Sequence, residues 1–210
     1  MRWREGRCVF VIAHDLTGLL ERAHADEDAP LGSLTELLNK ALFRDPLEQA
    51  RARRAKENFA VLFLDLDHFK DVDDMIGRLA CDDLLKAFAE RLRGFVRAMD
   101  TVARFGGDEF VVLVTGLQDA SHSAILAQKI LCSLATPFQI NGNEVSLTRS
   151  IGIFLYHADL DRADDYLERA DKVLYVAEEE VRNTYRFHQE TLDELFHSEV
   201  AIGTDLHHAL

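Results

Sequence analysis

The chain has 210 residues, 48% of them hydrophobic, and carries a formal net charge of -13 at pH 7. This length and this apolar content suffice for one buried core with short extensions. The negative charge argues against nucleic acid or an anionic membrane as the main partner, since both attract a basic face. A nucleotide bound through Mg²⁺ stays compatible with the charge, because the metal supplies the positive side.

The cysteines and the N-terminal residues indicate the cellular compartment in which we expect the protein. Cys8, Cys81 and Cys132 lie far apart and show no C-x-x-C spacing, which is typical of a reducing environment. The apolar run at 8–13 is too short for a secretion signal, and no stretch long enough to span a membrane follows it. We therefore expect a cytoplasmic protein with no membrane segment.

The first predicted elements are a buried strand at 7–13 and a polar linker at 21–33. Apolar residues at helical spacing then predict a helix over roughly 34–55. They are Leu34, Leu37, Leu38, Ala41, Leu42 and Leu47.

An unbroken apolar run from Phe59 to Leu64 predicts a central strand covered on both faces. Asp65 then stands at the C-terminal edge of this strand, the usual place for ligand chemistry in such sheets. A helix with an apolar stripe follows it. The stripe consists of Leu84, Leu85, Phe88, Leu92, Phe95 and Val96.

The pair Gly106-Gly107 predicts a two-residue hairpin turn, because both central positions of the favoured turn need positive φ. In this register Phe105 pairs with Asp108, and Arg104 with Glu109. Successive strand residues point to opposite faces, so only one of the two acids should face a cleft. The other is then free to pair with Arg104.

The next predicted elements are a helix over 121–135 and an Asn-Gly turn at 141–142, after which a strand at 147–156 completes a strand pair. A helix around 167–177 and a short strand at 185–187 follow. This order implies an α/β (α+β) sandwich with a mixed central sheet flanked by helices. Apolar residues between 192 and 200 suggest a terminal helix that leaves the domain.

Five motifs occur in a fixed order, within 34–43, 63–70, 104–110, 148–153 and 170–183. Together they resemble the GGDEF family of diguanylate cyclases over roughly residues 32–188. The resemblance implies a nucleotidyl-cyclase or palm-like fold. It also implies condensation of two GTP molecules into cyclic di-GMP, a bacterial second messenger, by a homodimer in which each subunit holds one GTP.

By position in the motifs, the resemblance implies that Asp65, the Leu66 carbonyl and Asp108 hold Mg²⁺ (or Mn²⁺). Asp108 would also help to deprotonate the attacking hydroxyl. Metal ions and positioning provide most of the catalysis in phosphoryl transfer, and Lys70 would offset charge on the phosphates. Further implied substrate contacts are Phe69, Gly106, Gly107 and Arg182.

The implied guanine site departs from the family pattern. Asp73, Arg78 and Asp82 stand where the family usually has Asn, His and Asp. Asp82 can still accept hydrogen bonds from guanine N1 and N2, but Asp73 lacks the amide donor of Asn. Cys81 replaces a glycine just before Asp82.

The sharpest departure is Glu178, which stands where the family has a phosphate-binding lysine; Val181 also replaces a glycine before Arg182. Opposite unit charges in contact interact by about 4 kcal/mol at an effective dielectric of 20, which bounds the loss. Two hypotheses therefore stay open. One is an active cyclase, and the other is a weak or inactive module that binds GTP or cyclic di-GMP and regulates an attached EAL phosphodiesterase.

Arg97 and Asp100 match the family's R-x-x-D site for inhibition by its own product. Arginine suits this role because its planar fork binds a phosphate or a guanine edge bidentately. A surface ion pair is the alternative interpretation of the same tetrapeptide.

The two ends carry short resemblances of their own. Residues 8–17, in the N-terminal segment 1–31, resemble the last strand and exit motif of a PAS sensory domain. Residues 199–210, in the C-terminal segment 189–210, resemble the helix that leads into an EAL domain. With the GGDEF domain at 32–188, they suggest a part of a longer sensor protein. No H-E-x-x-H zinc motif and no G-x-S-x-G serine hydrolase motif is present.

Overall fold

The structure, a computed structural model, describes residues 32, 34–53, 58–133, 135–156, 160, 162–180 and 182–188. The strand expected at 7–13, most of the linker and the helix expected at 192–200 lie outside these residues. Within them, no helix is both long and apolar enough to cross a lipid bilayer.

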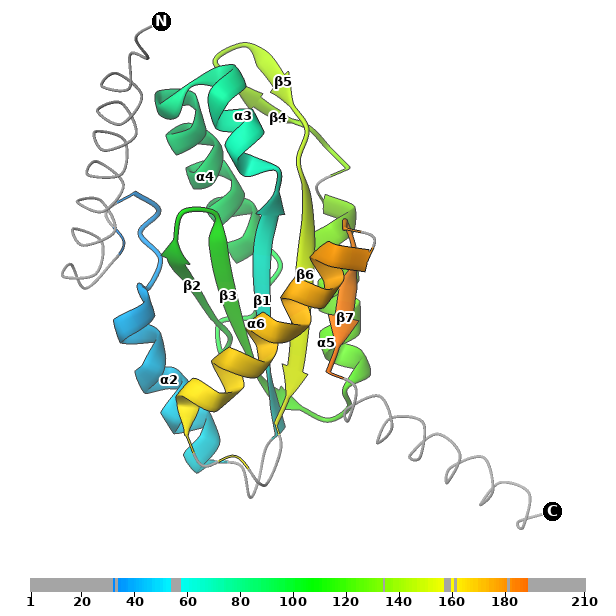
Figure 1. Cartoon of the computed structure of the whole chain (residues 1–210). Coiled ribbons are helices and arrows are strands. Elements are labelled where there is room, and N and C mark those ends of the chain that lie inside the picture. The colour runs from blue at the N-terminus through cyan, green and yellow to red at the C-terminus, as the bar shows by residue number, and fades with distance from the viewer. Residues whose placement is uncertain are drawn as a thin grey trace, which may run out of the picture.

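The centre of the fold is a five-stranded sheet in the order β2-β3-β1-β6-β7 (Figure 1). Its strands run antiparallel except for the parallel pair β6–β7, so the sheet is mixed, as the sequence predicted. The strands are β1 (Asn58–Asp67), β2 (Thr101–Gly106), β3 (Glu109–Leu117), β6 (Thr148–Leu155) and β7 (Tyr185–Phe187).

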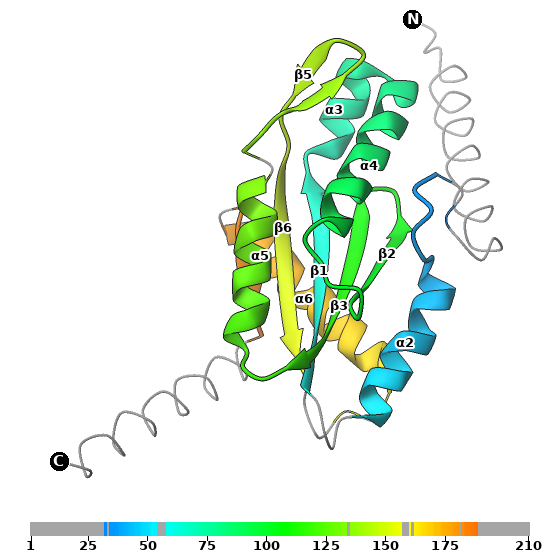
Figure 2. The same ribbon diagram turned by 180° about the vertical axis from the view of Figure 1, so that it is seen from behind.

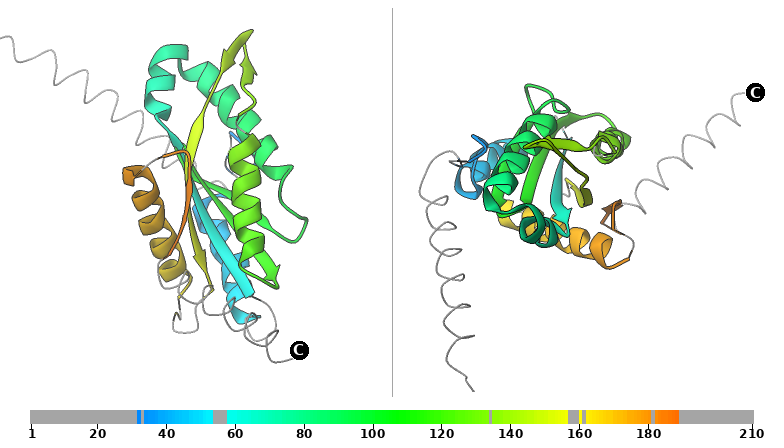
Figure 3. Two further views of the ribbon diagram at one scale, coloured as in Figure 1. Left: turned by 90° about the vertical axis from the view of Figure 1, so that its right-hand side faces the viewer. Right: turned by 90° about the horizontal axis from the view of Figure 1, so that it is seen from above.

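Helices cover both faces of the sheet, which makes a three-layer sandwich (Figure 3). Helices α2 (Lys40–Ala52) and α6 (Ala163–Glu180) lie on one face (Figure 1). Helices α4 (Arg78–Arg93) and α5 (Ser121–Ser133) lie on the other (Figure 2). The short α3 (Phe69–Ile76) follows the end of β1 and leads into α4.

Strand β1 is buried from both sides, which confirms the prediction from its unbroken apolar run. Leu62 and Leu64 belong to the core beneath α4 and α5. Val61 and Phe63 belong to the second core, beneath α2 and α6. This alternation fixes which acids at the end of β1 share a face, because residues two positions apart point the same way.

The predicted helix over 34–55 is shorter in the structure, where α2 begins at Lys40. The Asn39 side chain caps α2 by accepting a hydrogen bond from the Leu42 backbone N–H at 2.9 Å. Such a cap satisfies a helix-end donor and overrides the leucine spacing before it. Leu38 instead forms a parallel bridge to Ala103 at the edge of β2.

Two strand pairings differ from the prediction. Arg104 pairs with Phe110, and Gly106 with Glu109, because a bulge at Phe105 adds one residue to β2. The predicted pairs Phe105–Asp108 and Arg104–Glu109 are therefore wrong. The Asn-Gly turn joins β4 (Phe138–Ile140) to β5 (Asn143–Val145) in a separate hairpin, whereas β6 pairs with β1 in the main sheet.

Candidate active site

The candidate site lies where β1 ends beside the turn between β2 and β3. Asp65 pairs with Glu109 across the β1–β3 ladder and with Ser150 across the β1–β6 ladder. Leu66 and Asp67 continue β1 past its last pair with β3. Asp108 occupies the turn itself, next to this strand end. The topology thus brings together two carboxylates that lie 43 positions apart, as Asp65 and Asp108.

A pocket of about 500 Å³ opens between this strand end and α6. That volume lies in the range of small-molecule sites. Glu109 lines the pocket and Asp108 does not, which agrees with the expectation that only one of these acids faces a given cleft. The lining residues are Asp65, Glu109, Asp171, Lys172, Leu174, Tyr175 and Glu178.

The acids of the site interact strongly. Burial raises the pKa of Asp65 from 3.8 to about 8, and the neighbouring charges of Asp108, Glu178, Glu109 and Asp67 add to the shift. Burial also raises the pKa of Asp108, while Arg104 opposes the change. Like charges crowded in a poorly solvated site favour a bound proton or a bound cation.

These carboxylates suit a hard cation such as Mg²⁺, which prefers oxygen ligands. All the neighbouring charges that shift the pKa of Asp65 are carboxylates. Among the described residues, no cluster of three or more His, Cys, Asp or Glu side chains is arranged around a single ion. The ligand set expected from the family contains only two carboxylates and the Leu66 carbonyl, so it is smaller than such a cluster.

Arg104 holds the double-glycine turn. Its Nε and Nη2 donate to the Gly107 carbonyl oxygen at 2.9 and 2.7 Å. Gly107 has φ 45° and Gly106 has φ 157°, which favour glycine at both positions. Lys40, at the start of α2, provides the positive charge beside Glu109 and opposes the raised pKa of that acid.

Cationic groups approach the site from the end of α6. Arg182 Nη1 lies 3.4 Å from His68 Nε2, and His68 is the N-cap residue just before α3. Phe69 and Lys70 form the first turn of α3, and the Lys70 side chain is exposed. The structure therefore places the predicted phosphate-binding residue Arg182 next to the segment that carries the other one.

Glu178 points into the site. It lines the pocket together with Asp65, and its pKa is raised by burial and by Asp67, while Arg182 lowers it. The charge reversal noted in the sequence thus falls in the pocket itself. Any phosphate placed there would meet a carboxylate, where the resemblance predicts an amine.

The residues expected to bind guanine gather at the junction of α3 and α4, outside the lining of this pocket. Cys81 is buried, and its thiol is hydrogen-bonded to the Asp73 carboxylate. Burial, this bond and the charges of Asp73 and Asp82 raise the thiol pKa to about 12. Asp73 and Asp82 therefore both lie close to this buried thiol. Arg78 is the first residue of α4.

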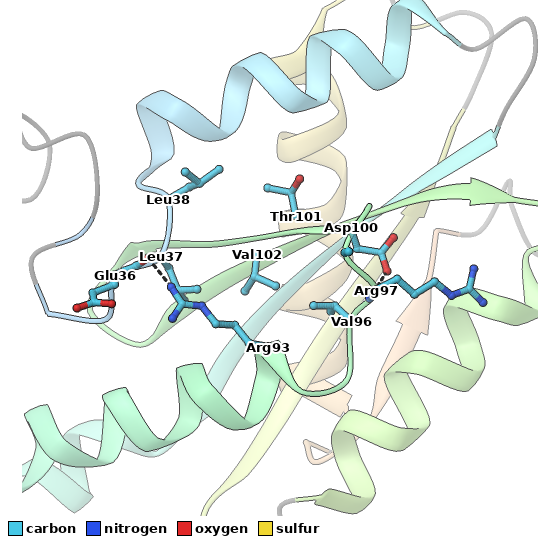
Figure 4. A pocket seen from close by; sticks show the side chains of 10 residues that line it. Glu36, Leu37, Leu38, Arg93, Val96, Arg97, Asp100, Thr101 and Val102 are labelled. Atoms are coloured by element: carbon cyan, nitrogen blue, oxygen red, sulfur yellow. Dashed lines mark hydrogen bonds between the residues drawn. The ribbon is translucent and has the colours of Figure 1, made fainter.

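The R-x-x-D residues line a second pocket, of about 350 Å³, beside β2 (Figure 4). Asp100 accepts hydrogen bonds from the backbone N–H groups of Arg97 at 2.9 Å and Thr115 at 3.1 Å. Asp100 thus braces the loop between α4 and β2. The Arg97 side chain extends away from Arg93 (Figure 4). The Arg93 guanidinium donates to the Glu36 carbonyl oxygen.

Comparison with known proteins agrees with this geometry. Residues 29–184 match the family described as "Diguanylate cyclase, GGDEF domain". The chain is 42% identical over 180 residues to the bifunctional diguanylate cyclase/cyclic di-GMP phosphodiesterase MucR of Pseudomonas aeruginosa, covering 85% of this chain and 26% of MucR. It is 38% identical over 171 residues to diguanylate cyclase TpbB of the same organism, covering 80% of this chain and 38% of TpbB.

Solved structures agree as well. The GGDEF domain of TpbB superposes with a TM-score of 0.71 at 38% identity, covering 75% of this chain and 93% of that one. The GGDEF domain of DgcB from Caulobacter crescentus, solved in complex with c-di-GMP, gives 0.69 at 25% identity, covering 76% and 93%. The family match, these identities and the shared fold show that the chain belongs to the GGDEF domain family of diguanylate cyclases.

Proposed function

We propose that the chain condenses two GTP molecules into cyclic di-GMP with release of pyrophosphate. The observation that supports the proposal is the strand pairing of Asp65, at the end of β1, with Glu109, which puts the double-glycine turn and its Asp108 beside that strand end. Burial raises the pKa of Asp65, and the charge of Asp108 adds to the shift. Diguanylate cyclase is the printed function of TpbB, and part of that of MucR. The chain spans only 26% and 38% of these two relatives.

In this proposal Asp65, the Leu66 carbonyl and Asp108 would hold Mg²⁺ or Mn²⁺. The metal would neutralise phosphate charge and make the 3′-hydroxyl easier to deprotonate. Asp108 is suited to accept that proton, because burial raises the pKa of its carboxyl toward the working range of a general base. Each subunit holds one GTP, so the reaction requires a homodimer.

The remaining roles concern binding of the substrate. Arg182 and Lys70 hold the phosphates, and the glycines of the turn, Gly106 and Gly107, allow the nucleotide to approach the backbone. Asp82 accepts hydrogen bonds from guanine N1 and N2, with Asp73, Arg78 and Phe69 around the base. Arg97 and Asp100 form the product site through which cyclic di-GMP inhibits the enzyme.

The second candidate is a weak or inactive module that binds GTP or cyclic di-GMP and controls an attached EAL phosphodiesterase. It is supported by Glu178 in the pocket and by two relatives. One is the bifunctional MucR, and the other is cyclic di-GMP phosphodiesterase NbdA of Pseudomonas aeruginosa, 36% identical over 200 residues. A cytoplasmic location and a preceding PAS domain belong to the same proposal.

The two candidates are separated by incubating the nucleotide-free protein with GTP and Mg²⁺. Release of pyrophosphate together with cyclic di-GMP supports the cyclase, and Asp108→Asn should then lower the rate by about 100-fold or more, as expected for loss of a general base and metal ligand. Binding of GTP without any product supports the regulatory module. If neither GTP nor cyclic di-GMP binds, both candidates fail.

A further inference from the structure

Asp67 is a buried carboxylate to which neither the family pattern nor the pocket assigns a role. It is the last residue of β1, and only 6% of it is exposed. It lies on the same side of the strand as Asp65, two positions away. A buried carboxylate is costly unless hydrogen bonds satisfy it, so its partners indicate what it does.

Both oxygens of Asp67 are hydrogen-bonded, and the two bonds reach different parts of the fold. Oδ1 accepts from the Ser150 hydroxyl in β6 at 2.9 Å. Oδ2 accepts from the backbone N–H of Asn183 at 3.1 Å, in the segment between α6 and β7. Asp67 therefore ties the end of β1 to the segment that follows α6.

That segment has an unusual backbone. Arg182 and Asn183 have φ values of 49° and 46°, a left-handed conformation that non-glycine residues rarely adopt. Two hydrogen bonds hold them there: the Asn183 N–H donates to Asp67, and the Arg182 N–H donates to the Ala177 carbonyl at 3.1 Å. The conformation aims the Arg182 side chain at His68, at the start of α3.

We propose that Asp67 is a positioning residue that sets Arg182 for the phosphates of the bound nucleotide. The inference rests on the proposed function. Its importance follows from Glu178, a carboxylate in the pocket at the position where the resemblance predicts an amine. Arg182 then carries more of the phosphate binding, and its placement depends on the bond between Asp67 and Asn183.

Asp67→Asn tests this bond. The amide has one oxygen and carries no charge: with the oxygen toward Ser150, the amide N–H₂ meets the Asn183 N–H and that bond is lost. With the oxygen toward Asn183, the bond persists but loses its negative charge, which makes it weaker. The Kd for GTP with Mg²⁺, measured by calorimetry on the full 210-residue chain, should rise about tenfold, the typical effect of one charge-assisted hydrogen bond. A pure charge effect has the opposite sign, because removing a negative charge beside the phosphates would tighten binding.

Two further variants separate positioning from general stability. Ser150→Ala removes the other hydrogen bond of the same carboxylate and should leave the Kd unchanged. Arg182→Ala should raise the Kd, and adding Asp67→Asn to it should change nothing more, because the two residues act through one contact. Should Asp67→Asn fail to fold, Asp67→Glu displaces the same oxygens by one methylene and replaces it in the cycle.

Each outcome decides the matter. Additive effects of Asp67→Asn and Arg182→Ala, or an equal effect of Ser150→Ala, would overturn the positioning role while the proposed function stands. An unchanged or tighter Kd for Asp67→Asn would do the same. A wild-type protein that binds no GTP would overturn the proposed function and this inference with it.

Discussion

Gly152 of β6 lies directly against the backbone of Leu174 in α6. A Cβ at position 152 would fall 2.3 Å from the Leu174 nitrogen and 2.3 Å from the Ala170 carbonyl oxygen, closer than real Cβ atoms come to other atoms. Glycine is therefore required for α6 to seat on the sheet. Because α6 carries Asp171 and Glu178, this contact also sets the depth of the acidic pocket.

Gly152→Ala should destabilise the protein by about 1–3 kcal/mol, because the backbone of α6 must move away to make room. Urea or thermal denaturation measures the change in the free energy of unfolding. Gly32→Ala is the matched control, since its Cβ would meet the Leu37 carbonyl oxygen at an ordinary 3.6 Å. Equal stabilities for the two variants would show that α6 does not pack as closely as described.

The acidic site should make stability depend on pH and on Mg²⁺. The folded pKa of Asp65, about 8, is above its ordinary value of 3.8, so between these values the folded state binds the extra proton. Stability of the metal-free protein should therefore fall as pH rises from about 4 to about 8 through this group. Mg²⁺ should raise Tm more at pH 8.5 than at pH 6, by binding the folded carboxylates.

Asp65→Asn is the control for this effect. It should raise the Tm of the metal-free protein at pH 8.5 and remove the added stabilisation by Mg²⁺. Differential scanning calorimetry at the two pH values measures both. A variant that is less stable than the wild type at high pH, or that keeps the full response to Mg²⁺, would contradict the placement of this acid.

Glu178→Lys should tighten GTP binding by about tenfold, because it replaces a repelling charge in a partly solvated pocket by an attracting one. Titration calorimetry with GTP and Mg²⁺ gives the Kd. Glu179→Lys makes the same charge change at an exposed position outside the pocket lining and should have little effect. If the two variants bind GTP equally, the phosphates do not reach α6 at position 178.

Arg97→Ala should weaken cyclic di-GMP binding about tenfold or more and leave GTP binding unchanged, since arginine contacts to phosphate or guanine are bidentate. The loop should keep its shape, because its bond to Asp100 comes from the backbone N–H of residue 97. Calorimetry with each nucleotide separates the two sites. Full retention of cyclic di-GMP affinity would remove Arg97 from the product site.

Local patterns anticipated most of the fold. The unbroken apolar run identified β1, and the stripe spacing identified α4 and α6, because these patterns report burial directly. The start of α2 was misplaced, since leucine spacing continues through 34–39 while the Asn39 cap and the bridge of Leu38 to β2 depend on the folded edge. The bulge at Phe105 left no local signal either, so the register of the hairpin was predicted wrongly.

The candidate site was likewise predicted only in part from the sequence. Its motifs name Asp65, Asp108 and Arg182 from the sequence, because ordered motifs keep their spacing along the chain. The role of Asp67 depends on bonds to Ser150 and Asn183, which are 83 and 116 positions away. A hint was available, because Asp65 and Asp67 share a face of β1, but their shared face does not reveal the partners.

The sequence by itself determined the family, the mixed sandwich and the residue types at the acidic edge, because burial patterns and motif order are properties of the chain. Only the tertiary structure decided that Glu178 faces the pocket, that Arg104 holds the turn and that Asp67 ties β1 to the end of α6. These relationships depend on distances between segments remote in sequence, which are set when the helices pack on the sheet.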